Sequence, residues 1–215
     1  MPYHHGNLRE ALIEAAVGLA EEKGPDAVVL REAARLVGVS HNAAYRHFAD
    51  RDALLRAVGL RALGAFGALM EQRIADAAPG ESGQAAALAR FEACGRAYVE
   101  FAVRRPGLFR MVCSWSLDVP PDTDHPSAGL APGGTEPDEI VEGARHPYSQ
   151  LSQRLDELCA TAVITAERRE GAEIGAWSAV HGYATLLLDG PLRHATAEER
   201  EYGMRMVVRM VQEGI

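Results

Sequence analysis

The sequence predicts an all-α fold in two parts, a unit of three short helices in residues 1–60 and a larger helical unit in residues 61–215. Apolar residues recur every three or four positions through most of the chain, which is the spacing of an amphipathic helix. Glycine and proline interrupt this pattern at intervals, and no segment alternates with a period of two over the length of a strand. We therefore expect helices joined by short breaks and no β-sheet.

Local signals place the N-terminal helices. The first begins near Leu8 and is stopped by Gly24-Pro25, and a short second helix in residues 30–37 is closed by Gly38. Ser40 is suited to cap a segment of barely two turns that runs to Phe48. Asp50 then caps a longer helix that continues toward residue 74.

The C-terminal helices follow from the same signals. Residues 76–83 predict a loop, residues 84–105 a helix, and Pro106 the first position of the next one. Residues 116–143 contain five prolines and four glycines, which predicts a mobile loop. Periodicity resumes at residues 151–158 and 177–188, and Thr196 with Glu199 forms a capping box for a last helix.

The composition is that of an ordinary globular protein. The 215 residues are 47% hydrophobic and 24% charged, with a formal net charge of −8, so any contact with nucleic acid must be local. Cys94, Cys113 and Cys159 are widely spaced and odd in number, which favours buried free thiols over disulfides. We find no secretory signal, and the charge-free stretch 174–188 is too short to span a bilayer, which indicates a cytoplasmic protein without a membrane partner.

Residues 30–48 have the pattern of a helix-turn-helix. Ala34 is small where two helices must cross, Gly38 can adopt the left-handed conformation of the turn, and Val39 fills the angle between the helices. Tyr45 and Phe48 can pack the second helix onto its neighbours. A helix of two turns can enter the major groove of double-stranded DNA and present its first residues to the base edges.

The predicted DNA-binding residues surround this second helix. Its first turn, with Ser40 as cap, offers hydrogen-bonding groups and a methyl group to the bases, and basic and aromatic side chains nearby can contact phosphates. The set is Arg31, Ser40, His41, Asn42, Ala43, Tyr45, Arg46, His47 and Arg51. Any small helical bundle can contain such a turn, and residues 1–60 carry 7 basic and 8 acidic side chains, so charge adds only mild support.

Three runs in this region resemble the DNA-binding domain of the TetR family of bacterial transcriptional regulators. They are Gly38-Val39-Ser40, Tyr45-Arg46-His47-Phe48 and Arg51-Asp52-Ala53-Leu54-Leu55. The lead-in Tyr3-His4-His5-Gly6-Asn7-Leu8-Arg9, and Trp177, His181 and Gly182 near the C-terminus, are similar to the branch with a Trp, His, Gly signature. The resemblance implies a ligand-responsive repressor that binds a palindromic operator as a homodimer, with a helical effector-binding and dimerisation domain. One departure is Val28-Val29-Leu30, because family members commonly begin this helix with Ser or Thr.

The resemblance also implies a dimer formed by the last two helices. The final helix carries an apolar stripe of Tyr202, Met206, Val207, Met210 and Val211. This stripe fits such an interface, although a terminal helix could also bury it against its own domain. Small residues in the preceding helix suit either arrangement.

In the TetR family the effector pocket lies among the middle helices, and a set of aromatic, sulfur-containing and polar residues could line it here. The set is Phe91, Cys94, Tyr98, Phe101, Met111, Trp115, Trp177 and His181. Each could instead belong to a plain hydrophobic core. We expect a small apolar or amphipathic effector, since the charge gives no sign of a strongly anionic one.

Three other readings have less support. The pairs His4 with His5 and His41 with His47 lack further ligands that would complete a metal site, so we expect neither a metal nor a cofactor, and His146 is expected in solvent. An all-helical enzyme could use His181 with Asp189 or Cys159, but no motif of phosphate binding, nucleophilic catalysis or zinc proteolysis supports it. A helix-turn-helix protein without an effector would need no cavity, and a cavity of several hundred cubic ångströms would argue against it.

Overall fold

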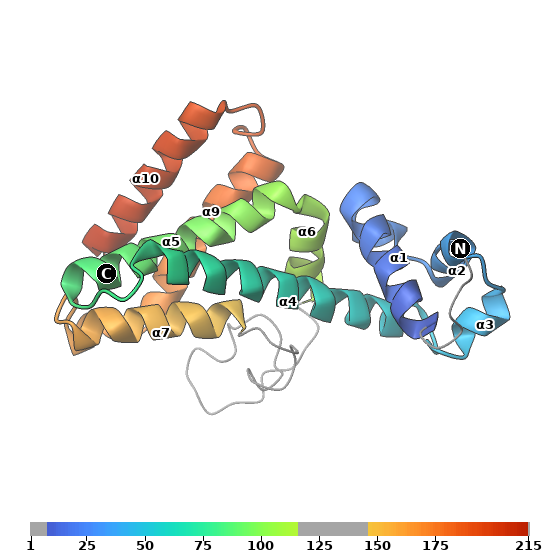
Figure 1. Cartoon of the computed structure of the whole chain (residues 1–215). Helices are drawn as coiled ribbons and strands as arrows, with labels where there is room; N and C mark the ends of the chain where they lie inside the picture. The colour runs from blue at the N-terminus through green and yellow to red at the C-terminus, as the bar shows by residue number, and fades with distance from the viewer. Residues whose placement is uncertain (1–7, 116–145, 215) are drawn as a thin grey trace.

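The computed structural model describes residues 8–115 and 146–214, without the side chains of Ser114 and Trp115. These residues form helices and no strand, which confirms the predicted fold class. The lead-in before Leu8 and the loop expected in 116–143 lie outside the described residues. Figure 1 shows an elongated molecule in which one long helix joins two groups of helices.

The first group contains α1 (Leu8–Lys23), the 3-10 turn η1 (Pro25–Ala27), α2 (Leu30–Val37) and α3 (His41–Tyr45). α1 packs on α2, and α2 on α3. The predicted turn is confirmed, because Gly38 has a φ of 77° and a ψ of 29°, in the left-handed region that glycine enters without strain. The amide of Val39 then donates to the carbonyl of Ala34 at 3.0 Å and closes the turn.

The caps of these helices also match the sequence. Ser40 accepts a hydrogen bond from the amide of Ala43 at 3.2 Å, and Asp50 accepts one from the amide of Ala53 at 2.7 Å. Val29 caps α2 without any side-chain hydrogen bond, as its apolar side chain requires.

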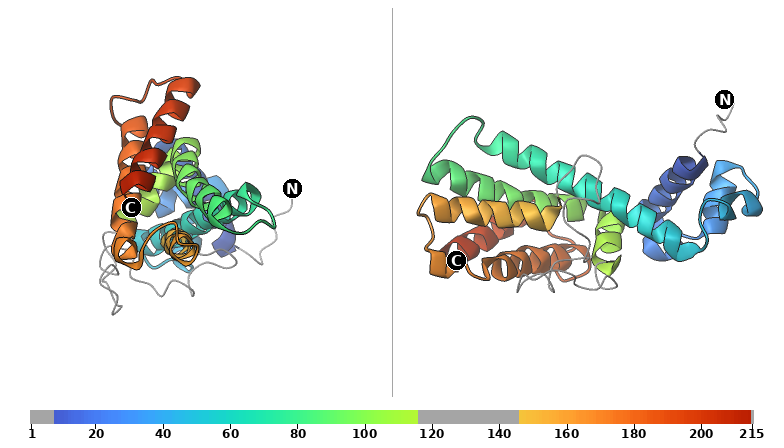
Figure 2. Two further views of the ribbon diagram at one scale, coloured as in Figure 1. Left: turned by 90° about the vertical axis from the view of Figure 1, so that its left-hand side faces the viewer. Right: turned by 90° about the horizontal axis from the view of Figure 1, so that it is seen from below.

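The second group is a bundle built around α4 (Arg51–Ala77), which continues from the first group without a break. The boundary expected after residue 60 therefore falls inside a helix. The other helices of this group are α5 (Gln84–Arg104), α6 (Pro106–Trp115), α7 (Pro147–Ala160), α8 (Ala166–Arg169), α9 (Ala172–Leu188) and α10 (Ala197–Gly214). α5 is central and packs against α4, α7 and α9, while α10 lies outside α9 and α5 (Figure 2).

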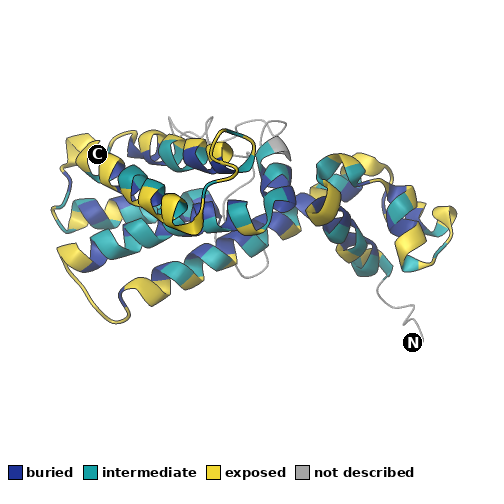
Figure 3. Ribbon diagram, turned by 90° about the horizontal axis from the view of Figure 1, so that it is seen from above, coloured by how far each residue is buried: buried dark blue, intermediate teal, exposed yellow. Residues whose placement is uncertain are grey.

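α4 is long and apolar enough to pass a length and composition test for a membrane span, with a mean hydropathy of 1.5. The sequence-based prediction of membrane spans did not include α4, because it considered only the charge-free segment 174–188. In the fold, α4 is the helix on which α1, α5, α6 and α7 pack, and its buried residues, in the dark blue of Figure 3, are all apolar or glycine. Its hydrophobicity is therefore that of a core helix.

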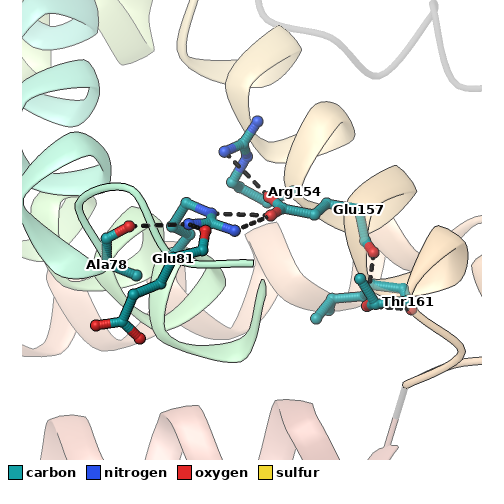
Figure 4. A network of polar contacts seen from close by, with 7 residues as sticks. Ala78, Glu81, Arg154, Glu157 and Thr161 are labelled. Carbon is teal, nitrogen blue, oxygen red and sulfur yellow. Dashed lines mark hydrogen bonds and ion pairs between the residues drawn. The ribbon is translucent and has the colours of Figure 1, made fainter. Parts of the chain in front are cut away.

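A polar network lies at the α4–α5 end of the bundle, which is far from α1 (Figure 1), and Figure 4 shows it from close by. Glu157 of α7 accepts a hydrogen bond from Arg90 Nε of α5 at 2.8 Å and pairs with Arg154 at 3.2 Å. Arg90 also donates to the carbonyls of Ala78 and Glu81 at 3.1 and 3.2 Å. The network thus ties the α4–α5 loop to both α5 and α7.

Candidate functional site

The exposed face of α3 is the first candidate site. Ala44 is fully buried and Phe48 is 3% exposed, so these two side chains hold the helix on the core. His41, Asn42 and Tyr45 are exposed on the other side, and the rings of His41 and Tyr45 meet edge to face at 4.5 Å. Of the two aromatic residues expected to pack α3 inward, only Phe48 does so, because Tyr45 lies one helical position from the buried Ala44.

The other predicted DNA-binding residues also lie at the surface. Ser40, Arg31, Arg46, His47 and Arg51 are exposed, and Ala43 is half-buried. Arg51 has a role that the sequence did not predict. Its Nε donates to the carbonyl of Val28 at 2.8 Å and its Nη2 to that of Pro25 at 3.2 Å, so this guanidinium ties η1 and its C-cap to the start of α4.

A cavity of about 500 Å³ inside the second group of helices is the other candidate site. α4, α5, α6, α7, α9 and α10 all contribute to its wall, which is mainly apolar. The lining residues are Leu63, Phe66, Met70, Phe91, Glu92, Cys94, Gly95, Tyr98, Val112, Cys113, His146, Pro147, Tyr148, Leu151, Ala176, Trp177, Val180, His181, Val208 and Val211.

The structure brings five of the predicted pocket residues together. They are Phe91, Cys94, Tyr98, Trp177 and His181. Tyr98 connects two of the others, because it accepts a hydrogen bond from Trp177 Nε1 at 3.1 Å and lies 2.9 Å from His181 Nδ1. Burial raises the pKa of Tyr98 and lowers that of His181, which favours the neutral form of each.

Two predicted pocket residues lie elsewhere, and a third is outside the description. Phe101 is 1% exposed and stacks on Phe66 at 4.4 Å, one turn beyond Tyr98, where the core is closely packed. Met111 is 2% exposed and belongs to the same core, since it points about 100° away from its cavity-lining neighbour Val112. The side chain of Trp115 lies outside the described residues.

His146 was expected in solvent, and this expectation is wrong. It is 7% exposed, lines the cavity and caps α7, where its Nδ1 accepts a hydrogen bond from the amide of Tyr148 at 3.1 Å. Pro147 was the overlooked signal, because proline at the first helical position marks the preceding residue as the cap. The residues that α4 contributes were missed because their spacing is that of any core helix.

Both cavity thiols are held in the neutral form. Burial raises the pKa of Cys94 to about 12 and that of Cys113 to about 11. The three cysteines are free thiols, as the sequence indicated, but only Cys94 is buried, while Cys113 and Cys159 are half-buried. Within residues 8–115 and 146–214, no group of three or more His, Cys, Asp or Glu side chains is placed to hold a metal ion.

The residues of the enzyme hypothesis are not assembled. His181 bonds to Tyr98, whereas Asp189 pairs with Arg110 of α6. Cys159 packs against a separate apolar cluster that includes Leu155 and Ile164.

The stripe predicted for the dimer interface divides into two faces. Val211 is 8% exposed and lines the cavity, so this part of the stripe belongs to its own domain. Tyr202 and Met210 are 58% and 59% exposed, with the half-buried Met206 between them at a spacing of four residues. Val207 is half-buried on the inner side.

The comparisons with known proteins agree with this division into two groups. A family described as "Bacterial regulatory proteins, tetR family" matches residues 12–58, and one described as "Tetracyclin repressor-like, C-terminal domain" matches residues 91–210. No curated protein matches the sequence.

Solved structures similar to this chain include a protein of unknown function from Rhodococcus sp. RHA1, with 28% identity, a TM-score of 0.74 and coverage of 100% of this chain and 98% of that one. A tetR family transcription regulator from Shewanella sp. PV-4 has 16% identity, a TM-score of 0.61 and coverage of 94% and 96%. The fatty acid degradation regulator FadR from Bacillus halodurans has 14% identity, a TM-score of 0.64 and coverage of 99% and 98%. At these low identities, the last two similarities support the fold only.

Proposed function

This chain belongs to the TetR family of bacterial transcriptional regulators, and we propose that it is a ligand-responsive repressor that binds a palindromic operator as a homodimer. The DNA-binding unit is residues 1–60, and the effector-binding and dimerisation unit is residues 61–215. We place the protein in the cytoplasm, where a bacterial regulator binds its operator. Trp177 and His181 both line the cavity, which supports assignment to the branch with the Trp, His, Gly signature.

The cavity carries the proposal. A helix-turn-helix protein without an effector needs no internal space, whereas about 500 Å³ lies within the range of small-molecule sites. Its wall is mainly apolar, which suits a small apolar or amphipathic effector. The same helices continue toward the DNA-binding unit, because α4 runs into it and α6 packs on α1.

The exposed α3 supports DNA recognition through the major groove. His41, Asn42 and Tyr45 lie on its free face, and Asn suits bidentate hydrogen bonding to adenine. Arg31, Arg46 and His47 surround this face and suit phosphate contacts, which position a protein without reading the sequence.

Asn42→Ala tests the DNA-binding part of the proposal. The operator is first selected from random duplexes, and affinities are then measured by fluorescence anisotropy for the operator and for a scrambled duplex. We expect Asn42→Ala to lose about 1 to 3 kcal/mol of discrimination between the two. Arg46→Ala is the control, since it should weaken both duplexes alike and reduce the salt dependence. Unchanged discrimination in Asn42→Ala would remove this residue from the interface.

A further inference from the structure

The charges of the described residues that line the cavity bear on the chemical class of the effector. None of the described residues that line it is Lys or Arg. His146 accepts a hydrogen bond through Nδ1, so that nitrogen carries no proton and the ring is neutral. Among these described residues the charged one is Glu92, which pairs with Arg96 at 2.7 Å. Among the described lining residues, a buried carboxylate or phosphate would therefore find no Lys or Arg to offset its loss of hydration.

The proton positions of Trp177, Tyr98 and His181 follow from the donors and acceptors available. An indole N–H can only donate, so the Tyr98 oxygen accepts from Trp177 at 3.1 Å. If the Tyr98 hydroxyl donates to His181 Nδ1 at 2.9 Å, each of these three atoms has a partner. If His181 Nδ1 donated instead, the hydroxyl proton of Tyr98 and the second ring nitrogen of His181 would both lack a hydrogen-bond partner. The first arrangement leaves fewer buried polar groups unsatisfied.

This arrangement places the remaining ring proton on His181 Nε2. No described residue accepts a hydrogen bond from that nitrogen, while His181 itself lines the cavity. Phe109 and Trp177 pack around the ring, with ring centroids 5.8 and 6.0 Å away. Among the described lining residues, His181 Nε2–H is thus an oriented donor in a mainly apolar wall, and by the same reasoning the ring proton of His146 lies on its Nε2.

Building on the function proposed above, we infer that the effector is a neutral, largely apolar molecule with a carbonyl-type acceptor oxygen, and that His181 Nε2–H binds this oxygen. His181 is then a specificity-determining residue. Tyr98 and Trp177 are positioning residues, because they hold the imidazole in the tautomer that donates.

The test uses displacement of Nile red, a neutral apolar dye, from the full-length protein at pH 7.5. Three competitors share one bicyclic skeleton: tetralin, α-tetralone and tetralin carboxylic acid. The readout is the ratio of the α-tetralone affinity to the tetralin affinity, in wild type and in His181→Phe, which keeps a planar ring without a donor. The comparison of variants removes the difference in hydration between the two competitors.

We expect this ratio to fall about two- to tenfold in His181→Phe, the range of one neutral hydrogen bond. His194→Phe changes an exposed histidine outside the cavity and should keep the wild-type ratio. Tetralin carboxylic acid should not displace the dye. An unchanged ratio in His181→Phe, or tight binding of the acid, would overturn the inference while the effector site itself stands.

A complete lack of binding and the tautomer of His181 test the inference in two further ways. If wild type binds neither Nile red nor any competitor, the effector site is overturned, and the inference with it. The tautomer can also be read in wild type from the ring-nitrogen chemical shifts of His181, which does not depend on folding of the variant. A proton on Nδ1 rather than Nε2 would contradict the inference.

Discussion

At the scale of single residues, the N-terminal helices differ in how they begin. Ser40 and Asp50 each satisfy a free amide of the helix that follows. Val29 stands at the equivalent position of α2, with φ −129° and ψ 139°, and provides no acceptor. Its backbone already has the extended conformation of an N-cap, so only the side-chain oxygen is missing.

Val29→Thr should therefore stabilise the protein. Thr keeps the branched shape of Val and adds a hydroxyl that can accept from an amide in the first turn of α2. We expect the free energy of unfolding to rise by about 1 kcal/mol, measured by urea denaturation. Val29→Ala is the control, because it shortens the side chain without adding an acceptor. If Val29→Thr and Val29→Ala have the same stability, the missing cap is not a weakness of this helix.

At the scale of elements, the sequence predicted α10 but could not divide its apolar stripe between inside and outside. Met204, Val208 and Val211 face inward, whereas Tyr202 and Met210 remain exposed. Periodicity reports which residues are apolar, and here two apolar faces lie side by side. Gly175 and Gly182 of α9 are also exposed, with no neighbour within 4 Å of a built Cβ, which suits close approach of another helix.

Met210→Asp should separate the proposed homodimer without unfolding the protomer. The side chain is 59% exposed in the protomer, so the charge stays in water unless a second protomer covers it. Light scattering should then report half the wild-type mass with an unchanged helical circular dichroism spectrum. Val211→Asp is the contrast, since this neighbouring residue is 8% exposed and its change should destabilise the protomer itself. A Met210→Asp protein that stays dimeric would exclude this face from the interface.

The crossing of α6 over α1 is a second feature at this scale. A Cβ built on Gly107 would lie 1.9 Å from the carbonyl oxygen of Ala20, which is backbone and cannot move by a side-chain rotation. Glycine is therefore required here by close approach, and the sequence offered no signal for it beyond the preceding Pro106.

Gly107→Ala should force α6 away from α1. We expect a loss of about 1 to 3 kcal/mol in the free energy of unfolding, as for other overpacked sites. Gly18→Ala in α1 is the control, because a Cβ there meets nothing within 4 Å, and it should gain about 0.5 to 1 kcal/mol from helix propensity. Equal stability of the two variants in urea denaturation would show that the helices can separate at no cost.

At the scale of the whole molecule, the sequence predicted the longer helices and the caps Ser40, Asp50 and Thr196, because these depend on neighbours in the chain, but it predicted neither α8 nor the His146 cap of α7. It predicted five cavity residues but placed Phe101 and Met111 there as well. Whether an apolar side chain lines a space or fills it depends on where six helices meet, and that is set by contacts between distant segments. His146 was misjudged for the same reason, and the hydrogen bonds of Arg51 to the carbonyls of Pro25 and Val28 could not be predicted, since these surroundings and partners appear only in the fold.

The two units meet where α6 and the end of α5 contact α1. Arg105 Nε donates to Glu21 of α1 at 2.6 Å, and Gly107 lies against the backbone of Ala20. On the other side, Val112 and Cys113 of α6 line the cavity. One short helix thus contacts both the cavity and the first group of helices, so a change in its position would alter both surroundings.

Arg105→Ala should weaken the coupling between the two sites without abolishing either. The ion pair with Glu21 is more than one-third exposed on both sides, so its loss should change stability little. In wild type, a ligand such as Nile red that weakens operator binding tenfold must itself bind tenfold more weakly to the operator complex, equivalent to about 1.4 kcal/mol. In Arg105→Ala this factor should fall, while the affinities of the free protein for dye and for operator stay near wild type.

Arg73→Ala is the matched control, because its ion pair with Glu100 joins α4 to α5 away from α1. Anisotropy with and without saturating dye gives the factor, and equal coupling in all three proteins would exclude the α5–α6 contact with α1 as the connection.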